Sequence, residues 1–148
     1  MSNENKALLH RWFDEVWNKG SVSAIDEMLA TNAVVHGLGP DLRGPQGFKP
    51  FHSAYRNAFP DVTIRVDDVV AEGNLVAVRW SGTGTHRGEG LGFPATGKRV
   101  NFSGTVFARV EQGKLIEGWN IFNQLEMLQQ LGVTNLPAAV SRQSSGVV

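Results

Sequence analysis

The spacing of apolar residues predicts three helices in the first sixty residues. Residues 3–18 place apolar side chains three and four positions apart, and Gly20 is a natural helix stop. A second, short helix is predicted after Ser21 or Ser23, whose hydroxyl groups are suited to cap it. A third helix with an aromatic face is predicted from Pro45, because proline fits the first turn of a helix.

Beyond Pro60 the apolar pattern changes to the two-residue period of β-strands. The last two strands form a hairpin around Gln112-Gly113, and a helical turn is expected after them at 126–131. The predicted strands, with a brief one before the third helix, are 33–36, 62–66, 75–86, 100–111 and 114–124. Long strands that contain glycine can bend, so the sheet is expected to curl.

This order of elements predicts an α+β domain with the helices on one face of the sheet. A curved antiparallel sheet with three helices on one face encloses a cone rather than a flat core. We expect one domain over residues 1–136. Residues 137–148 are small and polar, and they predict a flexible C-terminal tail.

Composition excludes several classes of function. The 148 residues contain 14 basic and 14 acidic side chains without a basic cluster, which argues against a nucleic-acid or membrane partner. The absence of cysteine excludes disulfides, a thiolate nucleophile and cysteine-type zinc sites. The first residues lack the layout of a signal peptide, and no apolar run approaches the roughly 18 residues of a membrane helix. A cytoplasmic location is therefore expected.

Four segments in register resemble the SnoaL-like polyketide cyclase group, which includes ester cyclases and belongs to the nuclear transport factor 2-like superfamily. The resemblance runs from about residue 4 to residue 132, and it is carried by NKALLHRWFDEVWNKG, GPQGFKPFHSAYRNAFPDV, VAVRWSGTGTHRGEGLGFPATGKRV and VFARVEQGKLIEGWNIFNQLEMLQQLG. It implies a cone-shaped fold with a pocket for a polyketide ester. Members of the group close a ring by intramolecular aldol condensation, without a metal or an organic cofactor.

The resemblance also implies a catalytic carboxylate on the last strand, four residues after a tryptophan. In this chain the tryptophan is Trp119, and the position four residues on is Asn123. Strand alternation places Trp119, Ile121 and Asn123 on one face, which we expect to face the pocket. Asparagine has no proton that titrates near neutral pH, but it can donate a hydrogen bond to a carbonyl or enolate oxygen.

Other candidate residues follow from their chemistry. His36 could replace the missing base, because its unperturbed pKa near 6.5 suits proton transfer at neutral pH. His86 ends a strand and could contact a ligand at the mouth of the cone. The four histidines lack zinc-site spacing, so no metal is assigned. Aromatic residues expected to line the pocket are Trp17, Phe51, Tyr55, Phe59, Trp80 and Trp119.

Two functions from different classes remain open at this point. The first is a cofactor-free cyclase, or a related lyase or isomerase, that acts on an apolar carbonyl compound. The second is a non-catalytic protein that binds a small molecule or a partner on the same fold, which the loss of the carboxylate favours. An epoxide hydrolase ranks third, because no inward Asp–Arg–Asp set is evident. Whether the protein forms a homodimer through the exposed sheet face, the second face that its long strands would have to cover, is not decided by the sequence.

Overall fold

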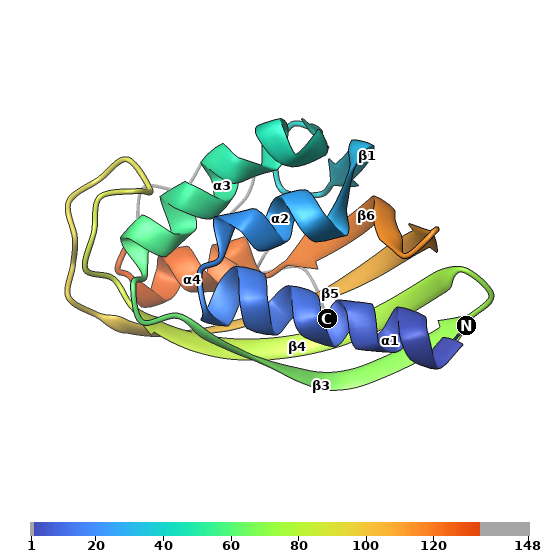
Figure 1. Ribbon diagram of the computed structural model, residues 1–148. Helices are drawn as coiled ribbons and strands as arrows, with labels where there is room; N and C mark the ends of the chain where they lie inside the picture. The colour runs from blue at the N-terminus through green and yellow to red at the C-terminus, as the bar shows by residue number, and fades with distance from the viewer. Residues whose placement is uncertain (1, 134–148) are drawn as a thin grey trace.

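The computed structural model describes residues 2–133, and the predicted tail at 137–148 lies outside them. It confirms the α+β class: a curved, unclosed six-stranded sheet carries the first helices on one face (Figure 1). The strand order is β2-β1-β6-β5-β4-β3. The helices are α1 (Ser2–Arg11), η1 (Trp12–Asn18), α2 (Val22–Met28), α3 (Gly44–Ala58) and α4 (Gln124–Gln130). The strands are β1 (Leu29–His36), β2 (Leu42–Arg43), β3 (Thr63–Glu72), β4 (Leu75–Thr85), β5 (Arg99–Glu111) and β6 (Lys114–Phe122).

The sheet differs from the expected one at its N-terminal strand. Strands β3 to β6 form the predicted antiparallel meander, but β1 lies parallel to β6 and pairs antiparallel with the short strand β2. The alternation within a strand does not specify its neighbour, because strand pairing is a contact between distant parts of the chain. The parallel pairing brings His36 beside Trp119, near the end of β6.

Two β-bulges change which side chains face the helices. In β3, Val66 pairs with Trp80 and Asp68 pairs with Arg79, so Asp67 is the additional residue. The sequence predicts a bulge or an exposed edge at this pair of aspartates. A second bulge, not predicted, lies in β6, where the register leaves Ile116 as the additional residue. Because side chains alternate, one inserted residue turns every following side chain to the other face.

The second half of the first helical segment is a π-helix. The N–H of Lys19 donates to the carbonyl of Asp14, five residues earlier, at 2.9 Å. The wider turn of a π-helix brings residues five apart towards the same side. Trp12 and Trp17 are spaced in this way, and with Phe13 they line one cavity beneath the helix.

Side chains of α3 bind the carbonyl groups of the π-helix. The buried imidazole of His52 donates from Nε2 to the carbonyl oxygen of Val16 at 2.6 Å. Arg56 donates to the carbonyl oxygen of Trp17 at 3.0 Å. Burial lowers the pKa of His52, which favours the neutral ring with its proton on Nε2. These contacts hold η1 against α3 and fix the aromatic side chains between them.

Replacing His52 by leucine is expected to lower the free energy of unfolding by about 1–3 kcal/mol, because it leaves a buried carbonyl group without its donor. Urea denaturation of the two proteins measures the difference. His10→Leu makes the same change on the exposed face of α1 and should shift stability by less than about 0.5 kcal/mol. Equal effects of the two changes would contradict this role of His52.

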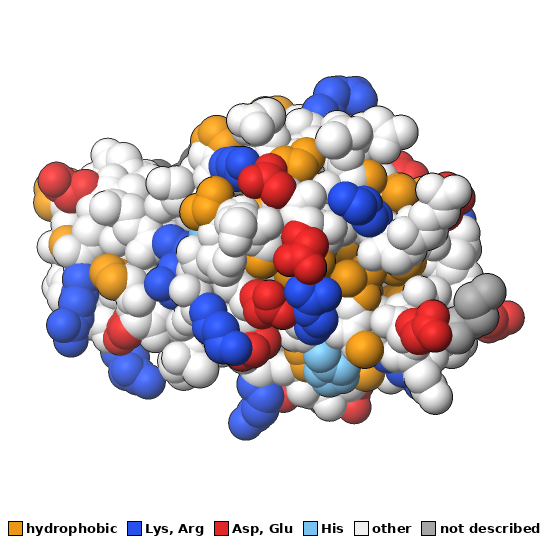
Figure 2. Space-filling view, in the orientation of Figure 1, with side chains coloured by type: hydrophobic (Ala, Val, Ile, Leu, Met, Phe, Trp, Pro, Cys, Tyr) orange, Lys and Arg blue, Asp and Glu red, His pale blue; other side chains and the backbone are white. Residues whose placement is uncertain are grey.

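Charged side chains of both signs are interspersed over the helical face seen in Figure 2. Arg11 of α1 pairs with Glu27 of α2 at 3.3 Å, and Lys49 of α3 pairs with Asp26 of α2 at 2.9 Å. These exposed ion pairs connect neighbouring helices, although each contributes little stability. None of the helices within residues 2–133 has the length and apolar character needed to cross a membrane.

Candidate functional site

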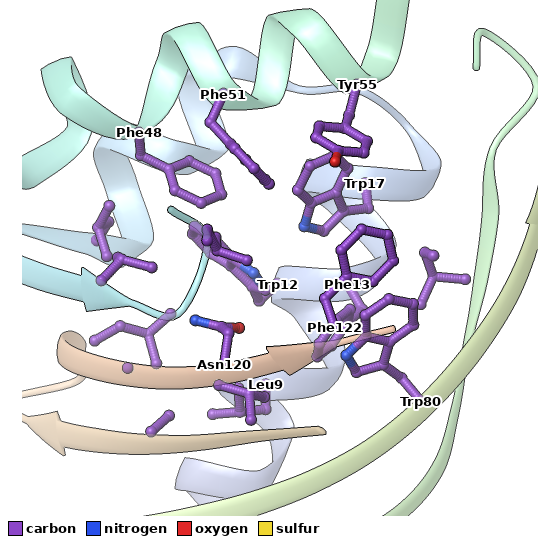
Figure 3. Close-up of a pocket in the computed structure, with 18 of the residues that line it drawn as sticks. Leu9, Trp12, Phe13, Trp17, Phe48, Phe51, Tyr55, Trp80, Asn120 and Phe122 are labelled. Atoms are coloured by element: carbon purple, nitrogen blue, oxygen red, sulfur yellow. The ribbon is translucent and has the colours of Figure 1, made fainter. Parts of the chain in front are cut away.

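An apolar cavity of about 110 Å³ lies between the helices and the inner face of the sheet (Figure 3). Helices α1 and η1 supply Leu9, Trp12, Phe13 and Trp17, and α3 supplies Phe48, Phe51 and Tyr55. The labelled residues of the sheet are Trp80, Asn120 and Phe122. Aromatic rings therefore surround most of the space, as is common in small-molecule pockets.

Glycines on the inner face of the sheet make room for the cavity. The ring of Trp80 lies on Gly104, where an added Cβ would come within 2.5 Å of the ring. On β6, Gly118 faces the same side, and an added Cβ there would lie 3.7 Å from the nearest atom, Nδ2 of Asn120. Gly104 thus lets an indole lie on the sheet, whereas Gly118 leaves space open.

Asn120 places an amide in this apolar lining. Its Nδ2 donates to the backbone carbonyl of His36 at 3.1 Å, and its oxygen points towards the open part of the cavity (Figure 3). The neighbouring Gly37 has a φ of 92° and lies against the backbone carbonyl of Asn120, where a Cβ would come within 1.9 Å. The end of β1 thus holds Asn120 in position.

Tyr55 places a hydroxyl group in the lining. Its hydroxyl oxygen accepts a hydrogen bond from Nε2 of Gln124 at 3.3 Å, which connects α3 with α4 beside the cavity. Burial raises the pKa of the phenol, so Tyr55 stays protonated at neutral pH. Its O–H group remains available as a donor.

The structure brings together five of the aromatic residues expected in the pocket. These five residues, which all line the cavity, are Trp17, Phe51, Tyr55, Phe59 and Trp80. Their positions follow from helical and strand periodicity.

The expected inward face of the last strand is the wrong one. Trp119 lies on the outer face of the sheet, with 39% of its surface exposed, and Asn123 lies beyond the strand at the start of α4. The side chain of Asn123 accepts a hydrogen bond from the N–H of Glu126 at 3.2 Å and caps that helix. Simple alternation from the buried Leu115 predicts Trp119 inward, but the bulge at Ile116 reverses the order.

His36 is also placed on the outer face, away from the cavity. Its ring stacks on Trp119 with a centroid distance of 5.7 Å. Nε2 lies 2.7 Å from a carboxylate oxygen of Glu117, and Nδ1 lies 2.9 Å from one of Asp41. These hydrogen bonds, first to Glu117 and then to Asp41, raise the pKa of His36. The imidazole and the Glu117 carboxylate therefore form an ion pair on the outer face.

The ion pair predicts a pH-dependent contribution of His36 to stability. A raised folded-state pKa gives a contribution that is complete below the unfolded pKa, near 6.5, and is lost as pH rises through the folded value. The difference in Tm between wild type and His36→Gln should be largest near pH 6 and shrink towards about pH 9. Thermal melts across this range test it, with His10→Gln as the control for losing an exposed histidine. A difference that grows with pH would contradict the assignment.

His86 packs against a second hydrophobic core rather than lying at the mouth of the pocket. The buried residues of this second core are Ala58, Phe59, Val62, Val100, Phe102, Met127 and Leu131. His86 is fully buried between Phe59 and Phe93, at centroid distances of 5.5 and 5.3 Å. Its Nδ1 accepts the backbone N–H of Thr96 at 3.1 Å, and burial lowers its pKa. This arrangement favours a neutral ring that fixes the loop after β4.

Sequence reasoning missed several residues of the site, among them Trp12, Phe13 and Asn120. Trp12 and Phe13 belong to the apolar stripe of the first predicted helix, so their orientation could have been inferred. Asn120 gives no such signal, because alternation with Trp119 on the inner face would put Asn120 on the outer face. Only the position of the bulge places it inside.

In the part of the chain that the structure describes, the side chains that face the cavity offer no acidic or basic group for proton transfer near neutral pH. Among the lining residues described, only Glu117 carries a carboxylate, and that carboxylate is bound to His36 on the outer face. No lining residue among them is a histidine. Within residues 2–133, no three acidic, histidine or cysteine side chains are grouped so that they could hold a metal ion. The cavity can therefore bind apolar groups and offer hydrogen bonds.

Comparison with known families agrees with this architecture. The model of the SnoaL-like polyketide cyclases matches residues 7–131. The chain belongs to this family. Its sheet and helices also agree with the nuclear transport factor 2-like fold expected from the resemblance. None of the curated proteins matches the chain at a significant level.

Solved structures with the same fold extend the family match. IdmH from Streptomyces antibioticus, a proposed polyketide cyclase, is 32% identical over 87% of this chain and 99% of its own, with a TM-score of 0.76. AclR from Streptomyces galilaeus, a proposed hydroxylase, is 29% identical over 98% and 92%, with a TM-score of 0.80. A protein from Catenulispora acidiphila with a ketosteroid isomerase-like fold is 12% identical over 86% and 93%, with a TM-score of 0.72, and shows the fold alone.

Proposed function

We propose that this SnoaL-like protein is a cofactor-free enzyme of the cyclase type that acts on an apolar, polyketide-ester-like carbonyl compound. The observation that carries the proposal is the amide of Asn120 set into a cavity otherwise lined mainly by aromatic and aliphatic side chains. An apolar lining favours burial of a hydrocarbon framework, and a few polar groups fix its orientation.

Proximity supplies most of the catalysis in this proposal. Binding holds the flexible linear substrate with its two reacting carbons in contact, so that less conformational entropy is lost on the way to the ring-closing transition state. The substrate needs a carbon that is already acidic, such as that of a β-dicarbonyl, because no base faces the cavity among the lining residues described. Its enol carbon forms a bond to a second carbonyl carbon. The enol oxygen becomes a carbonyl as its proton is released, and the second oxygen takes up a proton to become a hydroxyl group.

Asn120 and Tyr55 would hold the two oxygens of such a substrate. The amide oxygen of Asn120 can accept the enol O–H, and the phenol of Tyr55 can donate to the second carbonyl. The donor strengthens as negative charge develops on the carbonyl oxygen in the transition state. These roles replace those expected for Asn123 and His36, whose side chains lie outside the cavity.

The proposal is tested by incubating the protein with linear β-ketoesters that carry a second carbonyl group at ring-closing distance. Wild type should form the cyclic aldol faster than the buffer alone, and Asn120→Leu should be slower by roughly 2- to 12-fold for the loss of one hydrogen bond. Asn101→Leu makes the same change at an exposed position of β5 and serves as the matched control. A wild-type rate equal to that of the buffer for every ketoester would refute an enzymatic role.

A second candidate is a non-catalytic protein that binds the same kind of molecule. The neutral lining favours it, because general acid–base catalysis needs a titratable group within reach of the substrate. Saturable binding of a ketoester without turnover would support the binding protein. Turnover that is independent of pH between about 6 and 8 would support a cyclase that works by proximity, since no base then titrates in the range where histidine does.

We also propose a homodimer through the outer face of the sheet. Phe107 and Ile121 are 57% and 74% exposed there, on either side of Trp119 in the paired strands β5 and β6. Exposed apolar patches of this kind commonly mark interfaces. Light scattering tests the proposal: the wild type should have twice the mass of the monomer, and Ile121→Lys should shift the mass towards the monomer.

A further inference from the structure

We infer that Asn120 acts as a hydrogen-bond acceptor in the cavity, so that the pocket selects compounds with a hydroxyl or enol group over similarly sized compounds without one. The inference rests on the proposed function, because it assumes that the cavity binds an apolar small molecule. The inference adds that this molecule must present a hydrogen-bond donor to the cavity. A phenol, an enol or an alcohol meets the requirement, whereas a ketone or an ether does not.

The orientation of the amide is fixed by the backbone of β1. Nδ2 lies 3.1 Å from the carbonyl oxygen of His36 and donates to it. Turning the amide over would bring Oδ1 against that carbonyl oxygen, and two acceptors without a proton between them repel each other. The hydrogen bond to His36 therefore places the nitrogen of the Asn120 amide on the β1 side and its oxygen on the cavity side (Figure 3).

The carbonyl oxygen of His36 is itself held in place. His36 pairs with Trp119 in the parallel ladder between β1 and β6. On the outer face its ring is bound by Glu117 and Asp41, at 2.7 and 2.9 Å. Gly37 lies too close to the backbone of Asn120 for any side chain. The acceptor in the cavity is thus positioned by contacts on the opposite face of the sheet.

The surroundings of Asn120 give the acceptor its selectivity. Val106, its partner on β5, and Val35 on β1 are apolar residues of the same lining. A ligand without a donor leaves Oδ1 unpaired in this environment, and a ligand carbonyl at the same place is repelled. A hydroxyl group pairs with Oδ1.

Three probes of similar size separate these cases: p-cresol carries a donor, p-fluorotoluene has no polar hydrogen, and p-tolualdehyde carries only an acceptor. Dissociation constants are measured by NMR titration of the labelled full chain. Wild type should bind p-cresol roughly 2- to 12-fold more tightly than either of the other probes, the range expected for one hydrogen bond. Asn120→Leu should remove this preference, and Asn101→Leu, the matched exposed variant, should keep it.

Each outcome decides between the alternatives. A preference for p-cresol that persists in Asn120→Leu, or no preference in wild type, overturns the inference while the apolar pocket stands. A preference of wild type for p-tolualdehyde shows that a donor of the lining, the Tyr55 hydroxyl or the amide itself, decides selection, and it overturns the inference as well. Failure of all three probes to bind wild type refutes the pocket of the proposed function, and the inference with it. If Asn120→Leu does not fold, the absence of a preference for p-cresol in wild type still overturns the inference.

Discussion

Replacing Gly118 by leucine is expected to weaken the binding of p-cresol and p-fluorotoluene about tenfold or more while the protein stays folded. Gly118 lies on the inner face of β6, and a Cβ there meets only ordinary van der Waals contacts, the nearest at 3.7 Å. The added side chain enters the cavity of about 110 Å³ and takes the place of part of the ligand. Excluding two CH₂-sized groups from burial costs about 1.6 kcal/mol, which corresponds to more than tenfold in affinity.

The matched control for this variant is Thr105→Leu. Thr105 is exposed on β5, on the outer face of the sheet, so the same side chain is added without entering the cavity. NMR titration should show wild-type affinity for Thr105→Leu, and thermal melts should show that both variants fold. Wild-type affinity in Gly118→Leu would mean that the probes bind elsewhere.

The variant Phe59→Ala should lose about 3–5 kcal/mol of the free energy of unfolding, the usual range for removing a buried phenylalanine. Phe59 is 1% exposed and lines the cavity. Its ring meets Phe102 edge-on at a centroid distance of 4.8 Å and packs on His86 on the side of the second core. The substitution therefore opens a void between the pocket and that core, with little room for collapse. Chemical denaturation measures the loss.

Phe107→Ala is the control for the stability effect. The residue type and the change are the same, but Phe107 is 57% exposed on the outer face. Its replacement in the monomer should cost less than about 1 kcal/mol, because little surface leaves water when this side chain folds. Equal losses for the two variants would show that Phe59 is not a principal contact of the core.

The inward face of the last strand shows where sequence reasoning fails. Alternation from Leu115 assigns Trp119 and Asn123 to the pocket, and a large aromatic residue beside a polar one makes that assignment plausible. The extra residue at Ile116 reverses the alternation. A bulge is defined by the register between two strands, so no pattern within β6 alone reveals it. The polar residue of the site is consequently Asn120, one position from the tryptophan.

The same limit applies to His36. Its titration properties made it a candidate base, yet the side chain stands on the outer face because Val35, its neighbour in β1, faces the core. Its ion pair with Glu117 joins residues 81 positions apart in the sequence. Such a contact depends on β1 lying beside β6.

The sequence by itself determined most of the helices and strands, the α+β class, the family resemblance and the aromatic residues of the pocket that come from the helices and from β4. These features depend on local periodicity and on residue types, which can be obtained from short stretches of the sequence. Only the tertiary structure decided that Asn120 enters the cavity, that Asn123 caps a helix, and that His36 lies outside. The placement of these three side chains depends on which strands pair and in which register. Pairing and register arise from contacts between distant segments, which no single segment encodes.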